Sequence, residues 1–320
     1  MNVYYMLDPV ESQPTGANAK RRCRLTPVTS EEAVATKCAV VKVISSKEFN
    51  EMPQFNDLSI DFLNSLVEAE TNYVDVYLDY VIGSFSIPNK ENQLETFDTF
   101  AFYMDSHALI FGDDSGVAAQ NLREISDLGV IGADTTPRCL YVFLKQLLME
   151  DVAYIATMED EMEDLEEDML GRHKDVDSAT IMGYRRRAMK ITSYYEQIGT
   201  MTDLLADNEN KNLDPEQVQS YNNLSNYADH LASRGESLEN YGLELYQLHQ
   251  TTIDLTQNKI MQTLTIVTVC IAPLTLITGW FGMNVAMPGL QEPLLWVVLL
   301  VICIVILALL VLQFHRKKWL

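Results

Sequence analysis

The chain has 320 residues, and its 45 acidic and 23 basic side chains give it a formal net charge of −22. This charge argues against nucleic acid as a partner and suits small cations, although its ordinary consequence is solubility. Apolar residues gather in roughly the last sixty positions, so a single globular domain is excluded.

Residues 1–134 predict an α/β domain. Residues 1–36 show no periodicity and are expected to hold one or two strands with loose connections. The patterns that follow predict strands at 38–44 and 73–81, a helix at 58–66, and a hairpin made of 96–103 and 108–111. Glycine at both ends of segment 112–116 predicts a turn after the hairpin.

A helical pattern begins at Thr135-Thr136-Pro137, because proline is favoured in the first turn of a helix. Apolar residues then recur at three- and four-residue steps as far as Gly171. A second helix is predicted over residues 179–205. A third begins at Asp214-Pro215 and meets no strong helix breaker before the apolar end of the chain.

The first two of these helices are expected to pair antiparallel within residues 135–211. The first carries the acidic run 158–168, and the second carries Arg185-Arg186-Arg187. We interpret the acidic run as a solvated helix face rather than a cation site. Residues 212–263 are then a stalk, part of a third helix that approaches 100 Å at about 1.5 Å per residue.

Two uncharged runs follow, at residues 264–284 and 294–314, and each is long enough to cross ~30 Å of hydrocarbon as a helix. The loop between them, 285–293, has no lysine or arginine, whereas the tail 315–320 is basic. This asymmetry predicts a multi-pass protein of the cell (inner) membrane with both termini in the cytoplasm. The five isolated cysteines then predict no disulfide and no zinc–thiolate site.

Apart from Met261 and Leu264, one face of the third helix is small or polar across the first membrane run. This polar stripe consists of Asn258, Met261, Leu264, Thr268, Ala272, Thr275 and Gly279, and it continues toward the stalk as Asp254 and Gln247. Small residues also line packed membrane helices, so close helix packing is one explanation. We favour a water-compatible path surrounded by several copies, because packing alone does not require the amides and the acid on the stalk side.

Enzymatic function has little support. The sequence has no phosphate loop, no dinucleotide-binding fingerprint and no candidate triad, and its histidines share no ligand spacing. No organic cofactor is therefore expected.

The C-terminal quarter resembles the CorA family of magnesium channels. The resemblance rests on Asn258-Lys-Ile-Met-Gln-Thr-Leu-Thr265, on Pro273-Leu-Thr-Leu-Ile-Thr-Gly279, on Phe281-Gly-Met-Asn284, and on the basic end after the second run. It implies a funnel-shaped homopentamer in membrane lipid, with an α/β cytoplasmic domain, a long helical stalk and two C-terminal transmembrane helices. The first of these helices would line the pore.

The resemblance also implies roles for single residues. Ion entry falls to Gly282, Met283 and Asn284, the pore lining to the polar stripe, and the gate to Met261 and Leu264. A basic ring would come from Arg316, Lys317 and Lys318. Regulatory Mg²⁺ would bind carboxylates between subunits, for which the candidates are Asp75, Asp79, Asp214 and Asp229.

Mg²⁺ is thus expected both as the transported ion and as the regulator, with Co²⁺ and Ni²⁺ as lesser permeants. A zinc transporter of the same family and a membrane-anchored oligomeric scaffold remain as alternatives. A helix cap is a further interpretation of the Gly-Met-Asn motif itself, because Gly282 can end a helix while the Asn284 side-chain amide bonds a free carbonyl group.

Overall fold

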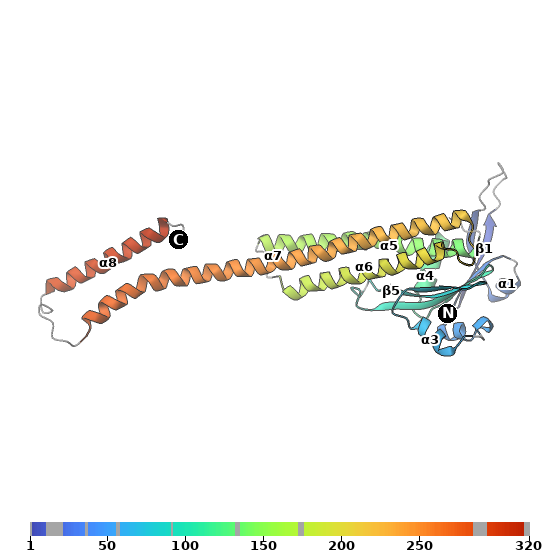
Figure 1. Cartoon of the computed structure of the whole chain (residues 1–320), viewed down its shortest axis with the longest axis horizontal. Coiled ribbons are helices and arrows are strands. Elements are labelled where there is room, and N and C mark those ends of the chain that lie inside the picture. The colour runs from blue at the N-terminus through green and yellow to red at the C-terminus, as the bar shows by residue number, and fades with distance from the viewer. Residues whose placement is uncertain are drawn as a thin grey trace. The chain divides into compact units, whose positions relative to one another are not determined.

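The structure is a computed structural model (Figure 1), and it describes residues 2–10, 22–35, 38–55, 58–90, 92–131, 135–171, 176–283 and 293–316. The chain divides into two units, Met1–Tyr246 and Gln247–Leu320. Each unit is described separately below.

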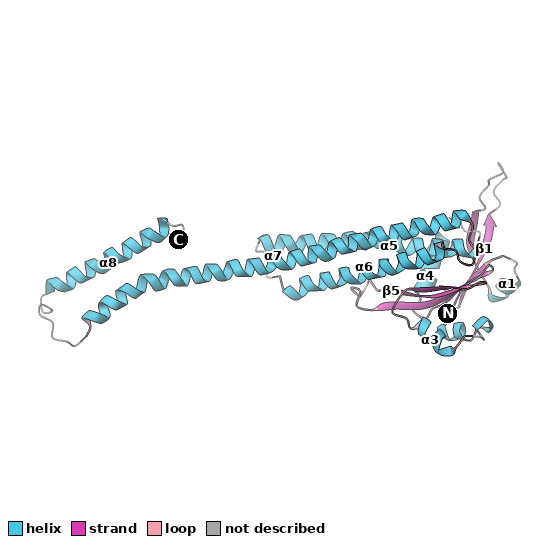
Figure 2. Ribbon diagram, viewed as in Figure 1, coloured by secondary structure: helices cyan, strands magenta, loops and turns pink. Residues whose placement is uncertain are grey.

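Figure 2 distinguishes the helices of the chain from its strands. The strands are β1 (Val3–Val10), β2 (Arg22–Val28), β3 (Val40–Ile44), β4 (Tyr73–Val76), β5 (Val81–Pro88), β6 (Phe97–Met104), β7 (Ala108–Gly112) and β8 (Val130–Ile131). The helices are α1 (Ser30–Ala35), α2 (Ser46–Asn50), the short 3-10 helix η1 (Pro53–Phe55), α3 (Ile60–Val67), α4 (Val117–Asp127), α5 (Thr136–Gly171), α6 (Ser178–Ala206), α7 (Pro215–Phe281) and α8 (Pro293–Arg316).

The strands form one eight-stranded sheet with the order β4-β5-β6-β7-β3-β1-β2-β8. Only β3 and β7 pair in parallel, and the other neighbours are antiparallel. Strand β3 lies between β1 and β7, and its Val41 is fully buried. The strand predicted at 38–44 is therefore an interior strand of the sheet, and the one or two strands expected in residues 1–36 are β1 and β2.

The prediction of a single strand over residues 73–81 is wrong. The chain reverses after β4, the Tyr77 N–H donates to the Tyr80 carbonyl oxygen (2.9 Å), and Val76 pairs with Val81 across the hairpin. The rings of Tyr77 and Tyr80 stack at 4.7 Å, and Tyr80 stacks in turn on Tyr103 at 5.4 Å. Apolar alternation continues through this turn because aromatic rings on both sides of it pack together, so the pattern hides the reversal.

Helices cover both faces of the sheet. On one face, α2, η1 and α3 pack against a cluster of buried side chains that comprises Ile44, Phe49, Phe55, Leu63, Leu66, Ile82, Ala101, Tyr103 and Ile110. On the other face, Phe143 of α5 stacks on Phe111 at 4.6 Å and contacts Phe85 at 5.7 Å. Side chains alternate between the two faces along β6, so Tyr103 joins the first cluster and Phe100 the second.

Within the first unit, α5, α6 and the first part of α7 run side by side, as Figure 1 shows. The predicted pairing of acidic and basic helices is present, because Arg187 donates to Glu161 at 3.2 Å. Close approach of α6 and α7 depends on Gly235, where a Cβ would lie 2.3 Å from the Thr192 hydroxyl oxygen. Ion pairs at the surface contribute only about 0–1 kcal/mol each, so buried packing holds the helices together.

The loop between β5 and β6 is fastened to α5 and α6. Lys90 of the loop pairs with Asp151 of α5, whose side chain is buried. Leu94 is also fully buried although its φ is +61°, and its carbonyl oxygen accepts a hydrogen bond from the Lys190 ammonium of α6 at 2.6 Å. A left-handed non-glycine residue costs of order 1–3 kcal/mol, which the burial of Leu94 and these two contacts offset.

The second unit contains the rest of α7 and helix α8. Both helices are long and apolar enough to cross a membrane. Their side chains are almost entirely exposed, including Leu276 on α7 and Leu300 on α8. So much exposed apolar surface is unfavourable in water, so it is expected to be covered by lipid or by other protein chains.

Candidate ion-conduction site

The polar stripe on α7 coincides with a groove. This groove is lined by Val267, Thr268, Ile271, Ala272, Thr275, Leu276, Gly279, Trp280 and Met283. Thr268, Ala272, Thr275 and Gly279 were predicted to share a face, and the structure places them together. The apolar members of the groove were missed because a stripe drawn at three- and four-residue steps is narrower than the helix surface.

Two hydroxyls in the groove donate inward to the backbone of their own helix. Thr268 Oγ1 donates to the Leu264 carbonyl oxygen at 2.8 Å, and Thr275 Oγ1 donates to that of Ile271 at 3.1 Å. Each hydroxyl has one proton and two lone pairs, so its oxygen still presents an acceptor to the groove. Such acceptors can receive hydrogen bonds from the waters of a hydrated cation. The same bonds would equally allow threonine to pack against another helix.

The stalk side of the stripe lies outside the groove. Asn258, Met261 and Leu264 precede it on α7, and Met261 and Leu264 are 59% and 58% exposed. Each three-residue step from Asn258 falls about 60° short of a full turn, so these three residues span about 120° of the helix surface, with Met261 in the middle. Apolar side chains this exposed make a narrow dewetting point if several copies meet, as the gate prediction requires.

Helix α7 ends at the start of the Gly-Met-Asn triplet, three positions before the predicted end of the first membrane run. The Gly282 N–H donates to the Thr278 carbonyl oxygen at 2.9 Å, and the Met283 N–H donates to that of Trp280 at 3.4 Å. A Cβ at Gly282 would lie 2.9 Å from the Thr278 carbonyl oxygen, so glycine fits this position closely. Asn284 lies outside the described residues.

Part of the predicted basic ring also lies outside the described residues. Arg316 is the last residue of α8, whereas Lys317 and Lys318 lie outside the described residues.

Two of the candidate regulatory acids belong to the hairpin of β4 and β5. Asp75 lies on β4, half-buried, and Asp79 is exposed in the turn. Burial, together with a hydrogen bond to Asp75, raises the pKa of the Tyr77 hydroxyl to about 12. Asp75 therefore already accepts a hydrogen bond from a neighbour within its own chain.

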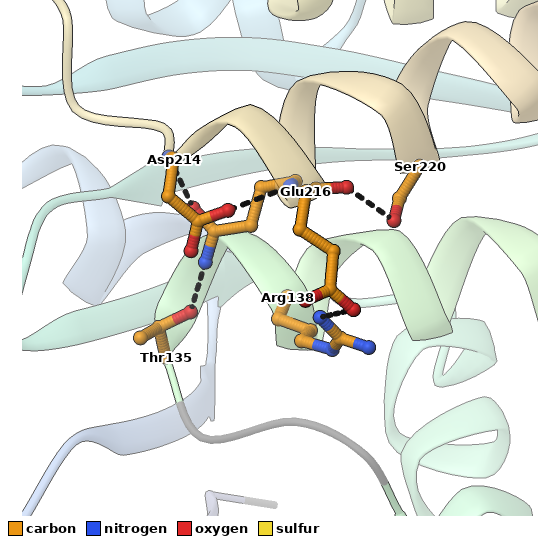
Figure 3. A network of polar contacts seen from close by, with 6 residues as sticks. Thr135, Arg138, Asp214, Glu216 and Ser220 are labelled. Atoms are coloured by element: carbon orange, nitrogen blue, oxygen red, sulfur yellow. Dashed lines mark hydrogen bonds and ion pairs between the residues drawn. The ribbon is translucent and has the colours of Figure 1, made fainter. Parts of the chain in front are cut away.

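Asp214 is the N-cap of α7, as Figure 3 shows. The Gln217 N–H donates to Asp214 Oδ1 at 2.8 Å, and the Asp214 N–H donates to Gln217 Oε1 at 3.0 Å. This reciprocal pair is a capping box. The amide of Gln217 also donates to Thr135 Oγ1 at 2.8 Å, just before α5, and Arg138 pairs with Glu216 at 3.6 Å. The start of α7 is thereby tied to the start of α5.

Asp229 is exposed on α7, beside Gly199 of α6, where a Cβ would lie 2.9 Å from Asp229 Oδ1. Across the described residues, no three side chains of histidine, cysteine, aspartate or glutamate are close enough together to hold a metal ion. The four candidate acids are thus not brought together within one chain. A regulatory site made of them needs carboxylates from a second copy.

Comparison with known proteins decides the family. Residues 45–316 match the family described as CorA-like Mg2+ transporter protein, which is most of the chain. The chain belongs to the CorA family.

Individual CorA relatives agree with this assignment. The cobalt/magnesium transport protein CorA of Thermotoga maritima is 22% identical over 263 residues, which are 81% of this chain and 75% of the relative. The complete structure of the CorA magnesium transporter from Methanocaldococcus jannaschii is similar with a TM-score of 0.79 at 16% identity, covering 100% of this chain and 99% of that one. The full-length CmaX protein gives a TM-score of 0.72 at 18% identity, covering 99% and 98%.

The CorA fold is therefore confirmed, with an α/β N-terminal domain, a long stalk helix and two C-terminal apolar helices. As a CorA-family protein, the chain is a divalent cation transporter and not an enzyme. The family forms homo-oligomers, and the two apolar helices are consistent with a membrane protein.

Proposed function

We propose that this protein is a homopentameric channel for Mg²⁺ influx, with α7 of each subunit lining a central path. The observation that carries the proposal is the groove on α7. Thr268, Ala272, Thr275 and Gly279 line it together with larger apolar side chains, along a helix that is long and apolar enough to cross a membrane. Both termini would lie in the cytoplasm of a cell whose inner membrane holds the channel, because basic residues follow α8 and are absent between the helices.

The outer mouth of the path is assigned to the Gly282-Met283-Asn284 triplet. Mg²⁺ gives up its water reluctantly, so a ring of neutral amide oxygens from Asn284 would hold the hydrated ion through its water molecules. A divalent ion moving inward gains ~4.6 kcal/mol per 100 mV, twice the value for a single charge. Transport inward therefore requires no nucleotide hydrolysis.

The gate is assigned to Met261 and Leu264. Five copies of each side chain around an axis would form apolar constrictions that close by excluding water. Below the gate, Asn258 would return the ion to water-accessible surroundings. The inner end of α8 carries Arg316, Lys317 and Lys318 as a ring of positive charge.

Regulation by internal Mg²⁺ is assigned to carboxylates between neighbouring first units, with Asp75, Asp79, Asp214 and Asp229 as candidates. Like charges would meet at such interfaces, and a bridging cation would relieve their repulsion. Cation binding to one conformation shifts the population toward it. High internal Mg²⁺ would thus favour a closed and symmetric assembly.

The test is flux into liposomes that contain the purified full-length protein. Wild type should carry Mg²⁺, and Asn284→Ala should abolish uptake while the oligomer remains intact by size-exclusion chromatography. Gln291→Ala is the matched control, because Gln291 is the other amide between the two helices. Normal uptake by Asn284→Ala would contradict the assignment of the mouth.

Competition between ions identifies the cargo. Mg²⁺ should block uptake of Co²⁺ and Ni²⁺ in the same liposomes, and Zn²⁺ should compete poorly. A preference for Zn²⁺ would make the protein a zinc transporter of the same family. Absence of any cation flux would leave a membrane-anchored scaffold.

A further inference from the structure

A cavity of about 270 Å³ lies in the first unit, where four parts of the chain meet. Its walls come from the hairpin of β4 and β5, the turn between β6 and β7, the start of α5, and the loop between α6 and α7. None of its residues lines the groove on α7. The volume is slightly below the ~300–1,000 Å³ of pockets for drug-sized molecules, so a smaller organic molecule fits it.

One wall of the cavity is apolar. Its members are Val76, Val81, Met104, Pro137, Leu205 and Leu213. Val81, Met104 and Leu205 are at most 5% exposed, so this wall forms the buried side. Such a wall binds the hydrocarbon part of a ligand by removing it from water. It offers no comparable gain to a hydrated metal ion.

The cavity is also acidic. Asp105, which is half-buried, and Asp214, which is exposed, both line it, whereas no lysine or arginine of the described residues does so. Asp105 accepts hydrogen bonds from the Tyr103 hydroxyl at 3.0 Å and from two backbone N–H groups. Asp214 accepts one from the N–H of Gln217 (Figure 3), and no described group bonds to its Oδ2. Since an ionised carboxylate has about four acceptor positions, both acids can bind a further donor, and their charge favours a cation.

Two neutral side chains of the cavity carry protons that no described group accepts. Gln217 is 5% exposed, and its amide donates one proton to Thr135 Oγ1 at 2.8 Å. The second amide proton and the proton of the Thr135 hydroxyl have no acceptor among the described residues. A buried donor without a partner is costly, so a ligand oxygen beside Gln217 and Thr135 is favoured.

We propose that this cavity binds a small aliphatic ammonium ion that carries a hydroxyl group. Asp105 and Asp214 hold the ammonium, the apolar wall covers the hydrocarbon chain, and Gln217 or Thr135 donates to the hydroxyl oxygen. The bound ion connects the turn between β6 and β7 to the N-cap of α7, so it stabilises the start of that helix. Ion conduction is not needed for this binding, and either assignment can fail without the other.

Isothermal titration calorimetry of the purified full-length protein in detergent tests the binding, with 5-amino-1-pentanol as the probe and a chelator present to remove Mg²⁺. Near neutral pH the probe is a cation, since an alkylamine titrates near ~10.4. It should bind saturably. Pentylammonium, which lacks the hydroxyl, should bind several-fold more weakly, and 1-pentanol, which lacks the charge, about tenfold more weakly or worse. Methylammonium should bind weakest of the cations, because it has almost no apolar part.

Substitutions locate the binding within the cavity. Asp105→Asn and Asp214→Asn should each weaken it by about tenfold, and asparagine at position 214 keeps the N-cap of α7. Asp79→Asn is the matched control, because Asp79 is an exposed acid of the nearby turn that does not line the cavity. Thr135→Val should reduce the advantage of 5-amino-1-pentanol over pentylammonium. Circular dichroism verifies that each variant is folded.

Three results would overturn the proposal. Equal affinity for methylammonium and 5-amino-1-pentanol would show only a general attraction of cations to an acidic surface. Unchanged affinity in both folded aspartate variants would place the binding elsewhere. In titrations without chelator, binding of Mg²⁺ alone with the same dependence on Asp105 would make the cavity a metal site instead.

Discussion

Replacing Lys90 by methionine should destabilise the first unit strongly, because it leaves a buried carboxylate without its counter-charge. Asp151 is 2% exposed, and Lys90 is the cation that pairs with it. Removing one partner of a buried pair typically costs about 3–5 kcal/mol. At roughly 2–4 °C per kcal/mol for a domain of this size, the melting temperature should fall by roughly 6–20 °C.

The loss should depend on pH. Burial raises the pKa of Asp151 above its usual value, and Lys90 opposes that rise, so Lys90→Met raises the pKa further. An acid whose pKa is higher in the folded state binds its proton more readily when folded, so unfolding free energy falls as pH rises between the unfolded and folded pKa values. The penalty is complete above the folded pKa and disappears below the unfolded value near ~3.9.

Thermal unfolding of the full-length protein in detergent, followed by circular dichroism between pH 4 and pH 8, measures both effects. The double variant Lys90→Met with Asp151→Asn should recover much of the loss, since no buried charge remains. Asp151→Asn alone should cost less than Lys90→Met, because the Lys90 side chain is 32% exposed and can turn to water. A larger loss for Asp151→Asn, or a Lys90→Met penalty that does not change with pH, would refute the buried-charge argument.

Three further substitutions test the fold and the channel. Gly83→Ala should lower the melting temperature, because a Cβ there would lie 2.2 Å from the Tyr73 carbonyl oxygen and would force β4 and β5 apart, at a cost of about 1–3 kcal/mol. Asp214→Ser should retain thermal stability because serine keeps the N-cap, whereas Asp214→Ala should lower the free energy of unfolding by about 1 kcal/mol. If Asp214 binds regulatory Mg²⁺, Mg²⁺ should no longer protect either variant from limited proteolysis. Met261→Ser and Leu264→Ser should each raise basal flux at low internal Mg²⁺, and an unchanged leak would remove that residue from the gate.

Local patterns predicted the long helices well. Helices α5, α6 and α7 have extended apolar periodicity and recognisable start signals, such as Asp214-Pro215. Strand β5 was largely missed because it is buried on both faces and does not alternate. It also contains Ser84 and Ser86, whose polarity disguises a buried strand; Ser84 Oγ donates to the Thr71 carbonyl oxygen at 3.0 Å. Helix α4 was missed as well.

The candidate site also has a part that the sequence predicts and a part that it does not. Thr268, Ala272, Thr275 and Gly279 share a face as a direct result of helical periodicity, which sequence alone supplies. The bond from Gln217 to residue 135 joins positions 82 apart in the chain, and no local pattern predicts such a contact. Contacts between subunits are even harder to predict from local patterns, since they depend on the surfaces of two folded chains.

The interior place of β3 affects how the protein can be shortened. The family match begins at residue 45, directly after β3 ends at Ile44. A protein truncated at that boundary would lose β1, β2 and β3 together, and β7 would become an open edge with unpaired N–H and C=O groups along Ala108–Gly112. Such edges recruit other strands, so the shortened protein should aggregate. A domain boundary drawn from sequence similarity is therefore not a boundary of the folded unit.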